Sequence, residues 1–494
     1  MVLLTLSVSL ASLKPPSCDS KTPHSRGDAC EQVPKFRAAF FFCALYVIAA
    51  GTGGTKANIS TMGADQFDDG EPRERALKLS FFNWWMFSIF FGTFFSNTIL
   101  VYIQDNVGWP LGYSIPTVGL AASLAVFLAG TRFYRHKRPS GSPFARMAKV
   151  LVAAARKRAV PAPVDTKQLY ELDVEEHAKR NKFRIDHTPS LRFLDKAAVK
   201  SGSTTPWMLC PVTQVEETKQ MIKMLPILAA TFIPSTMIAQ THTLFVKQGT
   251  TLDRSMGPGF HIPPASLSAF ITVSMLISLV IYDRYFVPAI SKYTKNPRGI
   301  TLLQRMGIGL AMHVLIMIIA ALCERKRLKT AREKGILEPK EEVPLTIFIL
   351  LPQFALMGIA DAFVEVAKIE FFYDQAPEGM KSLGTSYFTS SLGIGYFLSS
   401  FLLTTVTNIT KRHDKEGWVH DNLNTSHLDY YYMFLAVLTA INFVFFVLVS
   451  KSYSYNADVM ESKLEMQKAT EQVVPSVGEK ASLEADENSR KHLL

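Results

Sequence analysis

The stretch PLTIFILLPQFALMGIADAFVEVAKIEFF (residues 344–372) determines how the rest of the sequence is interpreted. A helix that crosses a bilayer core of about 30 Å needs about 20 mostly apolar residues, and this stretch exceeds that length. A surface helix of a soluble protein is apolar along one stripe only, whereas this stretch is apolar around most of its circumference. It therefore predicts a membrane-spanning helix that carries a few ionisable side chains.

Eight further runs have the same length and character. The nine runs are residues 36–59, 78–102, 110–131, 220–244, 264–286, 301–323, 344–372, 382–407 and 429–450. Together they predict an all-α membrane protein with about nine full spans. Residues 1–13 are apolar but too short to span. They fit either a signal peptide without a basic start or, as we expect, the second half of a spanning helix that begins upstream.

Composition agrees with a membrane protein. The chain has 494 residues, of which 48% are hydrophobic and 19% charged, against a soluble norm of about 25% charged. This balance excludes a disordered chain and speaks against an ordinary cytosolic enzyme. The net charge of +11 comes from basic residues concentrated in predicted inner loops, so membrane topology explains it better than a nucleic-acid partner does.

Positive charge in the loops sets the predicted orientation. Residues 132–158 carry nine Lys or Arg and no acidic residue, which indicates a cytoplasmic loop. Counting spans outward from it places 324–343 and 408–428 outside. The first of these loops is itself rich in Lys and Arg, and is an exception to the rule.

Outside loops are where glycans and disulfides are expected. The sequons at Asn408 and Asn424 fall in such a loop and are predicted glycosylation sites. Cys18 and Cys30 lie in the first outside segment, where they form either a disulfide or two free thiols.

The grouping of spans predicts four parts. They are a truncated N-terminal helical bundle (1–131), a cytoplasmic linker with a basic amphipathic segment (132–219), a C-terminal six-helix bundle (220–450) and a disordered cytoplasmic tail (451–494). Many secondary transporters consist of two six-helix halves joined by such a linker. Within the linker, Ser142–Arg158 has helical spacing with a basic face. It is either a helix on the anionic inner leaflet or a solvated loop helix.

Ionisable residues inside spans are functional candidates because their burial in a membrane is costly. Asp361, Glu365 and Lys368 lie on nearly one face of the run 344–372, since they are four and three residues apart. Asp361 is a candidate for proton coupling, because a carboxyl group in an internal cavity can gain and lose a proton as the cavity opens to either side. Glu365 and Lys368 are candidates for an internal pair or gate.

Lys56 is the candidate in the first full span, where it follows three glycines in GTGGTK (Gly51–Lys56). It either contacts substrate or extends to the cytoplasmic interface. Asn83, Gln240 and His242 are possible cavity-lining residues, although the last two fit a helix end equally well. His313 fits a packed histidine better than a proton relay.

The sequence contains no motif of a hydrolase, a nucleotide-binding protein or a metalloenzyme. We therefore expect no enzyme activity, no metal and no cofactor other than a proton gradient as the driving ion. An intramembrane enzyme is the weakest of the interpretations.

Several segments resemble the proton-dependent oligopeptide transporter family, in particular its plant nitrate/peptide transporter branch within the major facilitator superfamily. The resemblance rests on Gly51–Phe67 with the following FFNWW, on Thr251–Leu267, Leu303–Leu310 and Cys323–Leu328, and on Phe372–Ser400. It implies a twelve-helix, two-bundle symporter that works by alternating access. Its lysine in the fourth helix matches Lys56, and its acid in the tenth helix, usually Glu, matches Asp361.

The resemblance also marks two departures. Nitrate-transporting relatives can carry a histidine in the seventh helix, where this chain has Ile238. Family members carry Glu-x-x-Glu-Arg in their first helix, and no such motif precedes Lys56, because Met1 lies in what resembles the third helix. The chain is therefore expected to lack the first two helices.

These observations predict a proton-coupled transporter of di- and tripeptides, nitrate or related small metabolites. Its expected partners are a small-molecule substrate and the lipid bilayer, with no nucleic acid. The plasma membrane is the first expectation for its location and the vacuolar membrane the second. The alternative function is a transport-inactive truncated membrane protein or a regulatory subunit.

Overall fold

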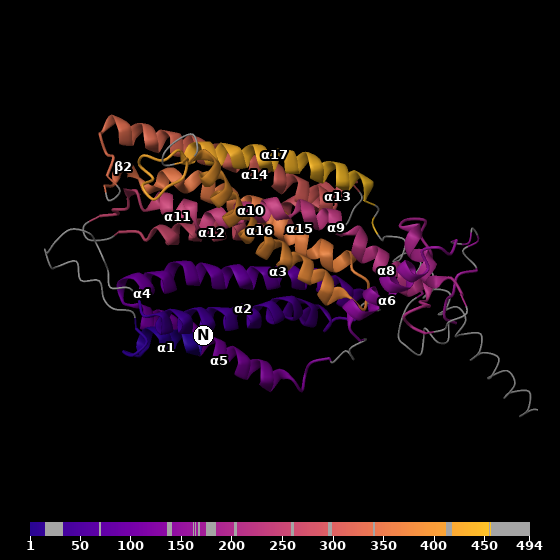
Figure 1. Cartoon of the computed structure of the whole chain (residues 1–494). Helices are drawn as coiled ribbons and strands as arrows, with labels where there is room; N and C mark the ends of the chain where they lie inside the picture. The colour runs from indigo at the N-terminus through magenta and orange to yellow at the C-terminus, as the bar shows by residue number, and fades with distance from the viewer. Residues whose placement is uncertain are drawn as a thin grey trace, which may run out of the picture. The chain divides into compact units, whose positions relative to one another are not determined.

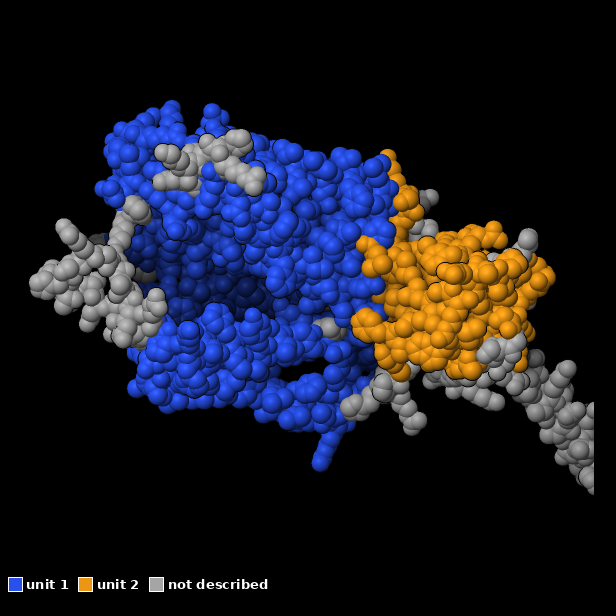
Figure 2. Space-filling model, in the orientation of Figure 1, with its two compact units in different colours: residues 1–139, 226–374, 381–450 blue, residues 140–225, 375–380, 451–494 orange. Residues whose placement is uncertain are grey.

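The computed structural model is helical and divides into two compact units (Figure 2). It describes residues 1–14, 33–68, 71–135, 141–161, 163, 165, 168–173, 184–201, 205–257, 261–294, 299–338, 341–411, 417–453 and 455. Unit 1 comprises Met1–Pro139, Pro226–Asp374 and Lys381–Ser450, and unit 2 comprises Ser140–Leu225, Gln375–Met380 and Lys451–Leu494. The predicted disulfide cysteines, Cys18 and Cys30, and nearly all of the predicted tail lie outside the described residues.

Unit 1 begins with helices drawn in indigo and purple in Figure 1. They are α1 (Val2–Ser9), α2 (Lys35–Ala64), α3 (Pro72–Phe95), the π-helix η1 (Ser96–Leu100), α4 (Val101–Asn106) and α5 (Trp109–Gly130). The short apolar α1 packs on α5, where the hydroxyls of Thr5 and Thr117 are 3.0 Å apart. Many large apolar side chains of these helices are exposed, among them Phe42, Tyr46 and Val126. Lipid tails are the environment that such surfaces require.

The rest of unit 1 is a second group of helices, drawn in magenta to yellow (Figure 1). They are α9 (Leu225–Ala230), α10 (Phe232–His242), α11 (Leu244–Gly249), η4 (Pro264–Leu267), α12 (Ser268–Ile281), η5 (Tyr282–Phe286), α13 (Val287–Thr294), α14 (Leu302–Glu333), η6 (Ile347–Leu350), α15 (Leu351–Gln375), α16 (Lys381–Thr410) and α17 (Leu428–Ser452). Two short parallel strands, β1 (Leu252–Asp253) and β2 (Val343–Thr346), pair with each other. The core of this group is mostly aliphatic and contains an aromatic cluster, in which Phe245 packs against Phe354 and Tyr432.

The prediction of nine spans is confirmed. In the described part of the chain, eight helices are long and apolar enough to cross a membrane. The remaining predicted run, 220–244, corresponds to the helix pair Val212–Ala230 and Phe232–Gly249. This pair counts as one span that is bent by 44°.

One predicted boundary was wrong. The run 301–323 continues as α14 to Glu333, so the first part of the basic loop 324–343 is helix. Arg327 in this extension is fully buried and makes two hydrogen bonds to Glu324, of 2.6 and 2.8 Å. It also donates to the Asn424 side chain at 2.7 Å. Part of the positive charge that violates the orientation rule is therefore neutralised inside the protein.

Unit 2 has a small core of its own. It contains α6 (Pro143–Arg156), the 3-10 helix η3 (Arg192–Ala198) and α8 (Val212–Lys223). The predicted amphipathic segment forms α6, and its Val150 and Ala153 are buried with Leu194 and Val215. Protein thus covers that apolar face of α6, while Phe144 on another side stays exposed. Contact of α6 with the membrane stays a prediction.

A buried ion network joins the elements of unit 2. The Lys219 ammonium lies 2.6 Å from Asp195 and 2.7 Å from Glu216, and Asp195 also contacts His187 at 2.9 Å. The three residues His187, Asp195 and Glu216 are close enough to share a metal ion. The Lys219 ammonium already bonds both carboxylates, so the network is complete without one.

Close helix packing in unit 1 depends on Gly395. A Cβ there would lie 2.7 Å from the carbonyl carbon of Ser235 and 2.9 Å from the nitrogen of Thr236, both in the α10 backbone. Gly393, two residues earlier on α16, has open space around its Cα. We predict that Gly395→Ala destabilises the protein by about 1–3 kcal/mol, because α16 must move away from α10.

Thermal unfolding of the detergent-solubilised protein measures this effect, with Gly393→Ala as the matched control. The Gly395→Ala variant should melt at a clearly lower temperature than wild type, and Gly393→Ala should not. Equal melting temperatures for the two variants would contradict the close approach of the helices.

Candidate transport site

The predicted charged face of residues 344–372 is buried in the second group of helices. Asp361 and Glu365 on α15 are each 7% exposed, and Lys368 is fully buried. The Lys368 ammonium lies 2.7 Å from a carboxylate oxygen of Glu365 and 3.3 Å from the hydroxyl of Ser235 on α10. It also lies 5.1 Å from the ring centroid of Phe388 on α16. Glu365 and Lys368 therefore form an internal ion pair, held between three helices.

Asp361 is left without a comparable partner. Its Oδ1 makes no hydrogen bond within the described residues, although it is buried. The Nε2 atom of His313, on α14, lies 3.5 Å from this oxygen. The two residues form an ion pair when His313 is protonated. A buried carboxylate with no compensating bond is unfavourable. Asp361 is thus the member of the face whose charge is least compensated.

The approach of α14 to α15 brings His313 to Asp361. One turn before His313, a Cβ at Gly309 would collide with the side chain of Val364 and would lie 2.9 Å from the Ala360 carbonyl oxygen. One turn earlier still, the Arg305 guanidinium donates to the carbonyl of Ala362 at 2.7 Å. Positions 305, 309 and 313 share one face of α14, so a single helix contact sets all three positions.

The predicted cavity-lining residues of α10 differ from each other in their surroundings. Gln240 is buried, and its amide donates to the Ser399 hydroxyl on α16 at 2.9 Å and to the Thr236 carbonyl at 3.1 Å. Its carbonyl oxygen has no partner among the described residues. His242 is exposed at the end of α10 and is close enough to Asp361 to interact with it electrostatically. Gln240 thus joins two helices.

Lys56 lies on α2 and is exposed. Within the described residues, no hydrogen bond or ion pair joins it to the Asp361 face. The glycines before it have open space around them. One turn further along α2, the Thr61 hydroxyl lies 3.4 Å from the Thr385 hydroxyl of α16. The structure therefore does not bring Lys56 and Asp361 together, although α2 contacts the second group of helices. The side chain of Asn83, on α3, lies outside what is described.

Figure 2 shows a deep hollow in the surface of unit 1, between the part built from α1 to α5 and the part built from α9 to α17. A hollow at this place separates the two groups of helices that carry Lys56 and the Asp361 face.

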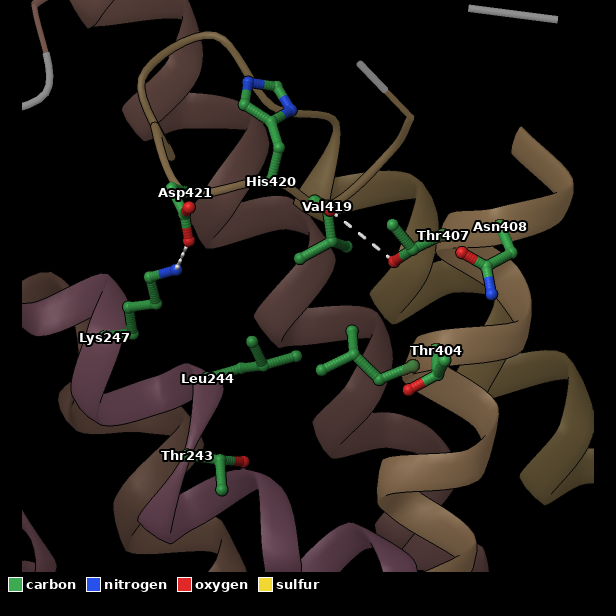
Figure 3. A pocket seen from close by; sticks show the side chains of 10 residues that line it. Thr243, Leu244, Lys247, Thr404, Thr407, Asn408, Val419, His420 and Asp421 are labelled. Carbon is green, nitrogen blue, oxygen red and sulfur yellow. Dashed lines mark hydrogen bonds and ion pairs between the residues drawn. The ribbon is translucent and has the colours of Figure 1, made fainter. Parts of the chain in front are cut away.

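A pocket of about 470 Å³ lies at the C-terminal end of α16 (Figure 3). Lys247 and Asp421 face each other across it at 3.6 Å, and Asn408 lies at its edge. Asn408 is exposed, as a glycan acceptor must be. Asn424 is 1% exposed, and its amide bonds to Arg327 and to the carbonyls of Glu338 and Glu341. A glycan on Asn424 would break these bonds, so that predicted site is not compatible with the structure.

Sequence reasoning did not predict the contact of His313 with Asp361. The sequence alone favoured a packed histidine. The contact joins residues of two different helices, so the spacing of residues along one helix cannot predict it. The only available signal was a polar side chain inside a long apolar run, which by itself marks a functional candidate.

Comparisons with known proteins show which family the chain belongs to. Residues 1–419 match the model of the POT family. The protein NRT1/PTR FAMILY 5.2 of Arabidopsis thaliana is 60% identical over 463 residues, which are 94% of this chain and 79% of that protein. NRT1/PTR FAMILY 5.3 of the same plant is 59% identical, over 94% of this chain and 78% of its own length.

Solved structures show the same fold. The structure of an auto-inhibited POT family peptide transporter has a TM-score of 0.57 and 20% identity, and covers 85% of this chain and 79% of its own. The in meso structure of the POT family transporter PepTSo gives the same TM-score and identity, with 85% and 78% covered. The expected transporter fold is therefore confirmed.

The family match covers most of the chain, and the two plant relatives cover nearly all of it. The members of this family are transporters and not enzymes, which agrees with the absence of catalytic motifs in the sequence. The chain belongs to the POT family of multi-pass membrane transporters.

Proposed function

We propose that this protein is a proton-coupled transporter of small solutes that works by alternating access. The observation that carries the proposal is Asp361, a carboxyl group buried in a membrane-spanning helix with one oxygen that has no hydrogen bond among the described residues. Ionisable groups at such positions mark proton and substrate pathways. Glu365 is already paired with Lys368, so Asp361 is the acid best placed to change its protonation state.

The proposed cycle has four steps. A proton enters from outside and neutralises Asp361. A solute binds in the hollow between the two groups of helices. The groups then rock so that the site faces inward. Proton and solute leave to the cytoplasm, and the deprotonated carboxylate favours return of the empty protein to the outward-facing state.

The names of the relatives support the proposed choice of substrates. The plant relatives are named NRT1/PTR proteins, and the solved structures are described as peptide transporters. Peptides carry a carboxylate, which suits the ammonium of Lys56. The histidine that nitrate-transporting relatives can carry is replaced by Ile238, which offers no charge to nitrate. We therefore favour di- and tripeptides or small organic acids over nitrate. The plasma membrane stays the expected location.

We predict that Asp361→Asn abolishes acid-stimulated uptake, because the amide cannot gain or lose a proton. The measurement uses the full chain in proteoliposomes with an acidic outside buffer, and tests labelled nitrate, dipeptides and tripeptides in turn. Asp421→Asn, which changes an exposed outer carboxylate, is the control and should keep the wild-type response to acid. Acid-stimulated uptake in Asp361→Asn at the wild-type rate would exclude the proposed coupling.

We predict a different effect for Lys56→Gln. If the ammonium attracts the carboxylate of the solute, the variant should raise KM for anionic or zwitterionic solutes by about tenfold, which corresponds to the roughly 1.4 kcal/mol of one such contact. Dependence on the proton gradient should remain. Lys35→Gln, at the start of α2, is the matched control. An unchanged KM in Lys56→Gln would show that Lys56 does not contact the solute.

A further inference from the structure

His313 and Asp361 have an unusual combination of burial and missing hydrogen bonds. His313 is fully buried, and within the described residues neither of its ring nitrogens has a hydrogen-bond partner. The same holds for Oδ1 of Asp361, 3.5 Å from His313 Nε2. A buried polar atom without a partner is unfavourable. A proton between Nε2 of His313 and Oδ1 of Asp361 would give two of these three atoms a partner.

The other charged groups nearby have partners of their own. On α15, Lys368 is paired with Glu365. On α14, the Arg305 guanidinium bonds to a backbone carbonyl and lies 4.0 Å from the Tyr282 ring centroid. Among the described residues, His313 is thus the ion-pair partner of Asp361. It can become cationic, and its ring makes no hydrogen bond.

Titratable groups on two further helices also face the pair. His242 on α10 interacts electrostatically with Asp361, and Tyr396 on α16 interacts with both Asp361 and Glu365. Glu365 in turn interacts with His313. Both His242 and Tyr396 are more than a third exposed, so water screens their charges more than it screens those of the buried pair.

We propose that His313 and Asp361 together hold the transported proton, as a two-residue site that spans α14 and α15. The O–H bond of the carboxylic acid breaks as an N–H bond forms at Nε2 of His313, and the electron pair of the broken bond stays on the carboxylate oxygen. The loaded pair is neutral in total in either form. The empty pair carries the single negative charge of Asp361.

The role of this pair in transport rests on the proposed proton coupling, but the pair itself can be tested without any solute. Infrared spectra of the full chain in lipid vesicles report a protonated carboxyl group through its C=O stretching band. The band of Asp361 is identified by its loss in Asp361→Asn. Its intensity is then followed across a pH series in wild type and in His313→Gln.

In wild type, a proton on His313 opposes protonation of the neighbouring carboxylate. In His313→Gln this opposition is absent, so the Asp361 band should persist to a pH about one unit higher or more, the size of shift that an opposite charge within 4–6 Å produces. His427→Gln is the matched control, since His427 stacks on Tyr430 in the outer loop. An unchanged midpoint in His313→Gln, or an equal shift in His427→Gln, would overturn the proposal.

A reciprocal measurement covers the case in which His313→Gln does not fold. The protein has 11 histidines, and ¹⁵N NMR of histidine-labelled protein in lipid separates imidazolium from neutral imidazole. Asp361→Asn should lose one imidazolium signal that wild type shows, because the carboxylate that stabilises His313⁺ is gone. The same set of imidazolium signals in both proteins would overturn the proposal.

These readouts separate the pair from the transport function. A shifted infrared band in a protein that takes up none of the tested solutes would leave the pair intact and overturn proton-coupled transport. Acid-stimulated uptake with an unshifted band would keep the transport function and remove His313 from the proton site.

Discussion

The cost of placing charge in a low-dielectric interior governs the arrangement of the α15 face. Two carboxylates and one ammonium lie within two turns of α15, and all three are buried. The ammonium of Lys368 is 2.7 Å from Glu365, so that pair is close to neutral and its desolvation is largely offset. The carboxylate of Asp361 has no such partner, so the free-energy cost of its burial is not offset. Protonation removes this cost, and for that reason the proposed cycle is built around a proton on Asp361.

Small residues set the positions of the groups around this face. Gly309 lets α14 approach α15, and Gly395 lets α16 approach α10. Gly358 on α15 has the same role toward α12, because a Cβ there would collide with the carbonyl of Ile271. Without a hydrophobic force between helices in lipid, such close contacts are the main source of specific association. The packing of the helices around the Asp361 face therefore depends on these three glycines.

The sequence was sufficient to predict those features that depend on the spacing of residues along one helix. Spans follow from apolar length alone, and the shared face of Asp361, Glu365 and Lys368 follows from helical spacing. It was not sufficient for contacts between helices. The pairing of His313 with Asp361, the extension of α14 around Arg327, and the burial of Asn424 all depend on side chains that meet only after folding.

The most direct test of proton coupling follows the proton instead of the solute. Proteoliposomes with a pH-sensitive dye inside and no imposed pH gradient are exposed to an outside gradient of a solute that the protein accepts. The account predicts that the inside becomes more acidic as the solute enters, and that Asp361→Asn shows no such change. Solute entry with no change of internal pH in the wild-type protein would contradict the account.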